Sequence, residues 1–251
     1  MQIMVLTALA TLCVVWIVVG TKILLVARRS RGYAEFSLGL SFFLMGGIGV
    51  PLNAAGRLLA SVEVAQVLAV ISSAFSVAGL VLLFSFTAHV FHRGRRWAQV
   101  VLVLVVAVGL YYVVGHGIER LASETREEAL AAQLRWTLFA VVGALLAFAW
   151  AGVSAFGHWW KLRKRVAFGL ADPIVVNRML LWSLFGLISV ATTVTAGLLF
   201  YSGNAIARDL IQPTTTSLGG LADSVILLLA FAPPKAYLEA VRRRAAAGAS
   251  A

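Results

Sequence analysis

Long apolar stretches alternate with short polar and basic segments along the whole chain. A helix that crosses the hydrocarbon core of a bilayer needs about 20 mostly apolar residues. Seven segments meet this length: residues 3–27, 36–60, 64–90, 97–114, 134–160, 174–201 and 216–232. They lack the alternation of strands, and a backbone in lipid satisfies its hydrogen bonds as a helix. The pattern predicts an all-α, polytopic seven-transmembrane-helix bundle over residues 1–234, followed by a short basic cytoplasmic tail over 235–251.

The composition changes this picture little and excludes several classes of protein. Of the 251 residues, 61% are hydrophobic and 12% are charged, whereas soluble domains are about a quarter charged. An ordinary soluble enzyme and a disordered chain are therefore excluded. The one cysteine, Cys13, lies inside an apolar run and excludes a disulfide framework within the chain. We expect a multi-pass membrane protein whose first partner is the lipid bilayer.

The positive charge of the chain is distributed unevenly between the loops. The formal net charge is +11, and basic residues concentrate in cytoplasmic loops of membrane proteins. With the N-terminus outside, 16 of the 21 Lys and Arg residues fall on the cytoplasmic side and 5 on the outer side. This distribution predicts an outside N-terminus and a cytoplasmic C-terminus. It also accounts for the basic charge without a nucleic-acid partner, and we expect none.

Local signals predict where several helices begin and end. Thr125 and Glu128 have the spacing of a capping box and open the fifth helix. Asp172-Pro173 supplies an N-cap and a first-turn proline for the sixth, and Pro233-Pro234 ends the seventh. From Arg126 to Trp160 the fifth helix would be about 52 Å long, whereas hydrocarbon is about 30 Å thick. We expect this helix to project from the membrane.

Polar side chains inside the spans are the candidates for a binding site. Asp223 is the clearest, since an acid in a membrane helix is costly; it lies seven residues into the last span, roughly 10 Å below its outer end. Arg57 follows Asn53 by four residues and shares its helix face. The other polar side chains at similar depth are Ser73, Ser76, Thr192, Thr193, Tyr112 and His116. Our hypothesis is an outward-facing polar vestibule centred on Asp223 and Arg57.

A structural interpretation of the same residues stays open. Ser and Thr often bond the backbone of their own helix or join neighbouring helices. Arg57 is near enough to the span end to extend its charge to water, and Asp223 can be a buried acid paired only for packing. The glycines of the second span, from Gly39 to Gly56, are interpreted as close-packing positions.

The sequence favours a protein without catalytic residues or cofactors. It contains no Gly-x-Ser-x-Gly, no His-Glu-x-x-His and no phosphate-binding glycine loop. His89, His92 and His158 lie at inner helix ends, where two helices can hold haem or a metal between imidazoles. Such histidines are more often polar tips at the membrane interface. We therefore expect no metal site and no cofactor.

Two motifs lie at the inner ends of the last two spans. The first runs from Gly169 to Arg178 with Trp182 beyond it, and it includes Asp172, Pro173, Asn177 and Arg178. The second runs from Leu229 to Pro234, includes Pro233 and Pro234, and is followed by Tyr237 and Arg242–Arg244. Both motifs resemble those of a group of uncharacterised bacterial seven-helix integral membrane proteins, which is similar to the membrane sensor modules of signalling proteins such as histidine kinases. The resemblance implies a sensory role and a location in the bacterial inner membrane.

Three functions are compatible with these observations. The preferred one is a receptor-like or sensory module, in which a ligand in the vestibule shifts the last two spans. Because about 18 residues follow Pro233, we expect the output on a separate cytoplasmic signalling protein. The alternatives are a small-molecule or proton-coupled transporter that uses Asp223, and an accessory subunit of a membrane complex. The segment after Pro234 has Tyr237 and Val241 on one side and Arg on the other, which suits anionic lipid or a cytoplasmic partner.

Overall fold

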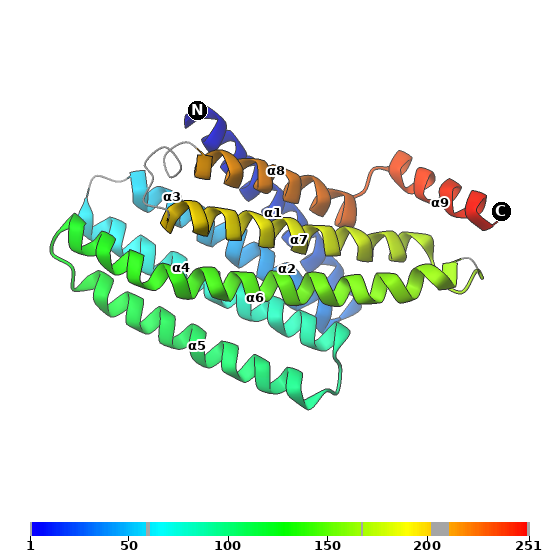
Figure 1. The fold of residues 1–251 in the computed structure, drawn as a ribbon, viewed down its shortest axis with the longest axis horizontal. Coiled ribbons are helices and arrows are strands. Elements are labelled where there is room, and N and C mark those ends of the chain that lie inside the picture. The colour runs from blue at the N-terminus through cyan, green and yellow to red at the C-terminus, as the bar shows by residue number, and fades with distance from the viewer. Residues whose placement is uncertain (1, 59–60, 167, 202–210, 250–251) are drawn as a thin grey trace. The chain divides into compact units, whose positions relative to one another are not determined.

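The computed structural model describes residues 2–58, 61–166, 168–201 and 211–249, and these residues fold almost entirely as helices (Figure 1). The elements are α1 (Gln2–Ser30), α2 (Tyr33–Phe42), η1 (Phe43–Gly49), α3 (Val50–Leu58), α4 (Val62–Phe91), α5 (Arg96–Leu121), α6 (Arg126–Val166), α7 (Pro173–Tyr201), α8 (Gln212–Phe231) and α9 (Lys235–Ala249). Seven helices within these ranges are long and apolar enough to cross a membrane. The prediction of seven apolar spanning helices is confirmed, and the chain is consistent with an integral membrane protein.

The chain forms two compact units. One comprises residues 16–147 and the other comprises residues 1–15 together with 148–251. Helices α1 and α6 each contribute to both units, because the division falls within them. The two units are described separately below.

In the unit of residues 16–147, the second apolar span packs tightly along α4. Two hydroxyl groups join them in opposite directions: Ser41 Oγ donates to the carbonyl oxygen of Gly79 at 2.7 Å, and Ser72 Oγ donates to that of Gly49 at 2.8 Å. A Cβ on Gly79 would lie 2.9 Å from the Ser41 carbonyl oxygen. The approach of the two helices therefore depends on small residues, as expected for membrane helices.

The second span contains a π-helical segment that the sequence analysis did not predict. Residues 36–60 were expected as one helix, but η1 separates α2 from α3. At its end the Val50 amide donates to the Met45 carbonyl, five residues earlier. Beside this segment the ring of Trp16 lies against Gly46, at a distance that leaves no room for a Cβ. The glycines therefore do allow close packing, and they do so along a backbone that is locally widened.

In the other unit, α7 lies between α8 and the second half of α6. Gly152 on α6 and Gly186 on α7 meet backbone to backbone, since a Cβ on Gly186 would lie 2.7 Å from the Gly152 Cα and 2.8 Å from the Phe148 carbonyl oxygen. Helices α7 and α8 run side by side (Figure 1). α9 continues from α8 after Pro233-Pro234 and contacts α7.

The predicted helix boundaries hold at the capped ends. Thr125 Oγ1 accepts from the Glu128 amide at 3.2 Å, and Glu128 Oε2 accepts from the Thr125 amide at 3.3 Å, which completes the capping box. Asp172 Oδ1 accepts from the Ile174 amide at 2.8 Å at the start of α7. α8 ends at Phe231, before the two prolines. With 41 residues α6 is about 60 Å long, twice the roughly 30 Å of hydrocarbon.

Other ends lie further along the chain than predicted. α5 continues to Leu121, whereas the apolar run predicted that this helix ends at Val114. Gly115 and Gly117 lie within this helix, where Gly115 lies against the Trp136 ring and Gly117 approaches Val70. The basic tail is also ordered, since 235–249 form α9.

Candidate functional site

Asp223 lies in the middle of α8 and is the polar centre of the α7–α8 pair. It is the twelfth residue of this 20-residue helix, so it lies about 16 Å from the start of α8 and deeper than the sequence indicated. Its side chain is 8% exposed. Ser189 Oγ on α7 donates to Asp223 Oδ2 at 2.9 Å. Asp223 Oδ1 is buried and has no hydrogen-bond partner among the described residues.

The neighbouring hydroxyl groups have separate roles. Thr192 packs its side chain against Gly219 of α8, where a Cβ would clash with it. Thr193 Oγ1 donates to the Ser189 carbonyl at 2.7 Å, and Ser224 Oγ donates to the Gly220 carbonyl at 2.7 Å, so both are bonded within their own helices. Ser189 is thus the hydroxyl that links the two helices at Asp223, and the open oxygen of the carboxyl can accept one more donor or a cation.

A second polar cluster surrounds His116 in the unit of residues 16–147. His116 on α5 is fully buried. Its Nδ1 lies 3.4 Å from Ser73 Oγ of α4, and its Nε2 lies 3.3 Å from Gln133 Oε1 of α6. The Tyr112 ring is parallel to the imidazole, with 5.5 Å between ring centroids. We call Ser73, Tyr112, His116 and Gln133 the His116 cluster; it joins three helices through polar contacts.

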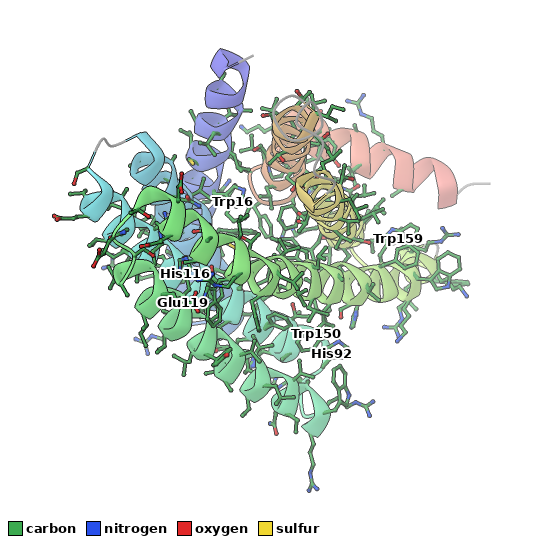
Figure 2. The ribbon with its side chains drawn as sticks, turned by 60° about the vertical axis from the view of Figure 1, so that its left-hand side comes forward. Trp16, His92, His116, Glu119, Trp150 and Trp159 are labelled. Carbon is green, nitrogen blue, oxygen red and sulfur yellow. The ribbon has the colours of Figure 1, made fainter. Side chains whose placement is uncertain are left out.

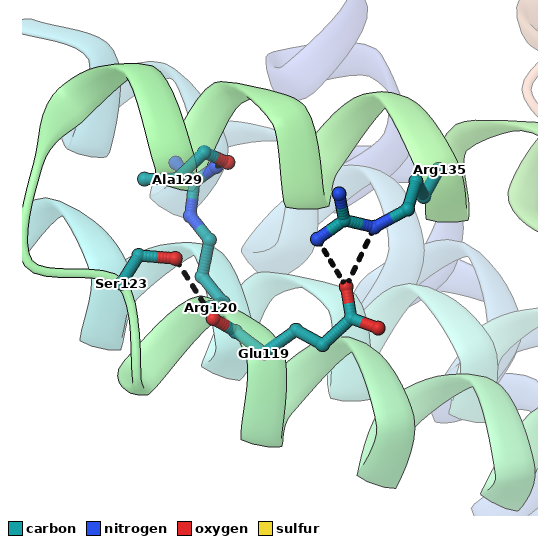
Figure 3. Close-up of polar contacts among 5 residues, drawn as sticks. All are labelled: Glu119, Arg120, Ser123, Ala129 and Arg135. Carbon is teal, nitrogen blue, oxygen red and sulfur yellow. Dashed lines mark hydrogen bonds and ion pairs between the residues drawn. The ribbon is translucent and has the colours of Figure 1, made fainter.

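The same ends of α4, α5 and α6 carry charged contacts close to the His116 cluster. Figure 3 shows Arg135 donating from Nε and Nη2 to Glu119 Oε2, at 3.0 and 2.9 Å. Arg120 Nη1 donates to the Ala129 carbonyl. Glu119 follows His116 by three residues on α5, and Figure 2 shows both side chains on this helix. Gln66 Nε2 donates to the Ser123 carbonyl at 2.7 Å, so α4 is tied to the α5–α6 turn.

The residues predicted for the vestibule fall into two sets, one in each unit. Ser73, Tyr112 and His116 lie together in the His116 cluster, whereas Asp223 and Thr192 lie at the α7–α8 contact with Thr193 beside them. Two further predicted residues have other surroundings: Ser76 Oγ faces Gly49, and Asn53 is exposed on α3. The Arg57 side chain lies outside the described residues, so its predicted proximity to Asp223 stays a prediction.

The motif residues at the other end of α7 organise α9. Asp172 and Pro173 begin α7, and Asn177 Nδ2 donates to the Tyr237 hydroxyl of α9 at 2.8 Å. Arg178 is the next residue of α7, and its Nε is buried with no hydrogen-bond partner in the described part of the chain. Pro233 and Pro234 separate α8 from α9. The first sequence motif therefore contacts the segment that follows the second, at the Asn177–Tyr237 bond.

Two residues of these clusters were missed by the sequence analysis. Ser189 precedes Thr193 by four residues on the same helix face, a spacing that was available as a signal. Gln133 lies just before the predicted start of the fifth span at residue 134, and it is therefore absent from the list of polar residues inside spans. Its partner, His116, was identified.

The three other histidines have contacts of ordinary structural kinds. The His89 ring lies 5.2 Å from the Tyr33 ring and the His92 ring 4.7 Å from the Trp97 ring. His158 Nδ1 lies 3.0 Å from the Ser154 carbonyl oxygen of its own helix. Among the residues that the structure describes, no group of three or more His, Cys, Asp or Glu side chains could hold a metal ion.

An apolar cavity opens between α4, α5 and α6. Its volume is about 460 Å³, and its wall includes Phe84, Val105, Gly109, Phe139 and Tyr112 of the His116 cluster. Of the seven long apolar helices in the described residues, α5 is the least buried. The walls of this cavity are almost entirely apolar.

Comparison with known proteins adds no family. No family model, no curated protein and no solved structure matches the chain.

Proposed function

We propose that this protein is a membrane-embedded sensory module in which a small ligand binds at Asp223 and changes the packing of α7, α8 and α9. The observation that carries the proposal is the open oxygen of the Asp223 carboxyl, buried in the middle of a membrane helix. A buried acceptor without a partner costs about 1–3 kcal/mol. A small cation or a hydrogen-bond donor that reaches Oδ1 removes this cost.

The arrangement of α7 supports a path from the ligand to α9. Ser189, which bonds Asp223, lies 12 residues after Asn177, which bonds Tyr237 of α9. The two contacts are about 18 Å apart along one helix. α8 reaches the same helix α9 directly through Pro233-Pro234. A ligand that prefers one packing of α7 against α8 shifts the population toward it, and α9 follows because it is attached to both helices.

The orientation of the chain gives this path a direction. With the basic loops in the cytoplasm, the N-terminus lies outside and α9 lies inside. A ligand then reaches Asp223 from the outer end of α8, and the change in the packing of α9 takes place in the cytoplasm. The bacterial inner membrane and a separate cytoplasmic signalling protein complete this proposal.

Amide hydrogen exchange of α9 in nanodiscs tests the proposal. Sodium or methylammonium chloride replaces choline chloride at constant ionic strength, and exchange is measured over residues 235–249. We expect a change in wild-type α9 that is absent in Asp223→Asn and retained in Ser224→Ala, whose hydroxyl bonds only its own helix. An equal response in Asp223→Asn, or no response of the wild type to either cation, contradicts the proposal.

A transporter is the second candidate, because the same mid-helix carboxyl is a group that can bind and release a coupling ion. Proteoliposomes loaded with a pH-sensitive dye distinguish the two. A transporter carries protons or sodium down an imposed gradient and loses this flux in Asp223→Asn. A sensory module gives no flux in either protein while α9 still responds to the cation.

A further inference from the structure

The inner ends of α6 and α7 and the first turns of α9 enclose a cavity that the proposed function does not use. Its volume is about 390 Å³. We call it the C-terminal pocket, and its walls include Trp159, Arg163, Val176, Leu180, Tyr237 and Val241. A second cavity of about 580 Å³ adjoins it, because the two share Val166, Pro173 and Ala245. All of these residues belong to one compact unit.

The C-terminal pocket has one apolar side and one polar side. Val176 and Leu180 are neighbours on one face of α7, and Val241 faces them from α9. The polar side consists of the Arg163 guanidinium and the Asn177–Tyr237 hydrogen bond. A soluble anion in this pocket would not contact the apolar side, and a hydrocarbon chain would not form a polar contact with the guanidinium. The pocket therefore suits a ligand that has both an anionic and an apolar part.

The cation of the pocket, Arg163, is an exposed side chain that lies over two aromatic rings. The Arg163 Cζ lies 5.2 Å from the centroid of the Trp159 ring and 4.6 Å from that of the Trp160 ring. Both distances are in the range of cation–π contacts, and a guanidinium offers a planar N–H edge for a bidentate contact with an oxyanion. Figure 2 shows Trp159 on α6, close to the end of this helix.

The surroundings of the pocket are predominantly positive. Arg242 of α9 lines the adjoining cavity. The acid in that wall, Asp172, is already engaged in capping α7 through the Ile174 amide. The ammonium nitrogen of Lys164 lies 6.0 Å from the centroid of the Trp160 ring. The site therefore combines several cations, aromatic rings of the kind enriched at membrane interfaces, and an apolar wall on a long apolar helix.

We propose that the C-terminal pocket binds an anionic phospholipid, with the phosphate on Arg163 and an acyl chain along Val176 and Leu180. The apolar wall belongs to a helix that continues into the membrane (Pro173–Leu199), so the hydrocarbon of the lipid enters the bilayer without a break. Basic pockets between membrane helices bind lipid headgroups in this way. The proposal does not depend on a ligand at Asp223.

Native mass spectrometry of the full-length protein tests this site with defined lipids. Detergent-solubilised protein is titrated with phosphatidylglycerol and, separately, with phosphatidylcholine of the same acyl chains. We expect one phosphatidylglycerol to bind more tightly than phosphatidylcholine. Arg163→Gln should weaken phosphatidylglycerol binding about fivefold, from about 1 kcal/mol for one basic residue at a lipid headgroup. Arg163→Lys keeps the charge but loses the bidentate N–H edge of the guanidinium, so it should lose part of the affinity and bind between the wild type and Arg163→Gln.

Arg165→Gln is the matched control, because it removes the same charge from the same end of α6 at an exposed residue that lines neither cavity. It should leave the affinity for phosphatidylglycerol unchanged, and equal melting temperatures of the variants show that folding is intact. Equal losses in Arg163→Gln and Arg165→Gln would show attraction by net charge alone and overturn the site. Equal binding of the two lipids, or displacement of phosphatidylglycerol by equimolar inorganic phosphate, would overturn it as well.

Discussion

Ser189 on α7 donates a hydrogen bond to Asp223 on α8 across 2.9 Å, and the second oxygen of the same carboxyl is buried without a hydrogen-bond partner among the described residues. The pair therefore satisfies one half of the carboxyl group and leaves the other half open. In a carboxyl group that is buried only for packing, hydrogen bonds to both oxygens would make the folded state more stable. This asymmetry is the physical reason for proposing a ligand at Asp223.

A double-mutant cycle measures how strongly this bond joins the helices. Ser189→Ala and Asp223→Ala should each lower the free energy of unfolding, and their coupling should lie between about 0.6 kcal/mol, the average for hydrogen bonds between membrane helices, and about 1.7 kcal/mol, the maximum. The free energies come from steric trapping or from denaturation in mixed micelles. Ser189→Ala combined with Ser224→Ala should show no coupling, because Ser224 bonds its own backbone. A coupling near zero for Ser189 and Asp223 would mean that the bond contributes nothing.

The contact between Gly152 and Gly186 predicts a sharp difference between two glycine substitutions. Gly186→Ala should destabilise the protein by about 1–3 kcal/mol, because the added methyl group meets backbone atoms that can move only if the helices separate. Gly157→Ala on α6 meets no described atom within 4 Å, and it should stabilise the helix by about 0.5–1 kcal/mol. Thermal unfolding in detergent compares the two variants. Equal effects would argue against the close crossing of α6 and α7.

The burial of His116 predicts a large loss of stability on truncation. His116→Ala should lower the free energy of unfolding by about 2–4 kcal/mol, because it leaves a cavity and removes a polar partner from both Ser73 and Gln133. Ile118→Ala on the same helix removes a side chain that is 65% exposed, and its effect should be much smaller. The same unfolding assay gives both values, and a His116→Ala variant as stable as Ile118→Ala would exclude a structural role for the cluster.

The sequence predicted the elements of this fold whose signals are local. Apolar runs define seven helices whatever their packing. The caps at Thr125 and Asp172 and the break at Pro233 likewise need only neighbours within a few residues. The π-helix from Phe43 to Gly49 has no such local signal, and its Gly46 packs against Trp16, 30 positions away in the chain.

The candidate site was predicted only in part for the same reason. Asp223 and His116 were found because polar groups inside spans are costly. The partner of each depends on the rotation of one helix against another, which a single sequence does not encode locally. Ser189 was hidden among several hydroxyl residues on α7, and Gln133 lay outside the predicted span although α6 begins at Arg126.

Seven membrane crossings are the basis of every proposal made above, and cysteine labelling in intact cells tests them most directly. Single cysteines replace Arg93, Glu124 and Leu170, one in each of three successive exposed turns, in a Cys13→Ala background. A membrane-impermeant thiol reagent should label position 124 from outside, and positions 93 and 170 only after the membrane is permeabilised. Labelling of 93 and 124 from the same side would contradict the seven crossings, and with them the membrane burial of Asp223.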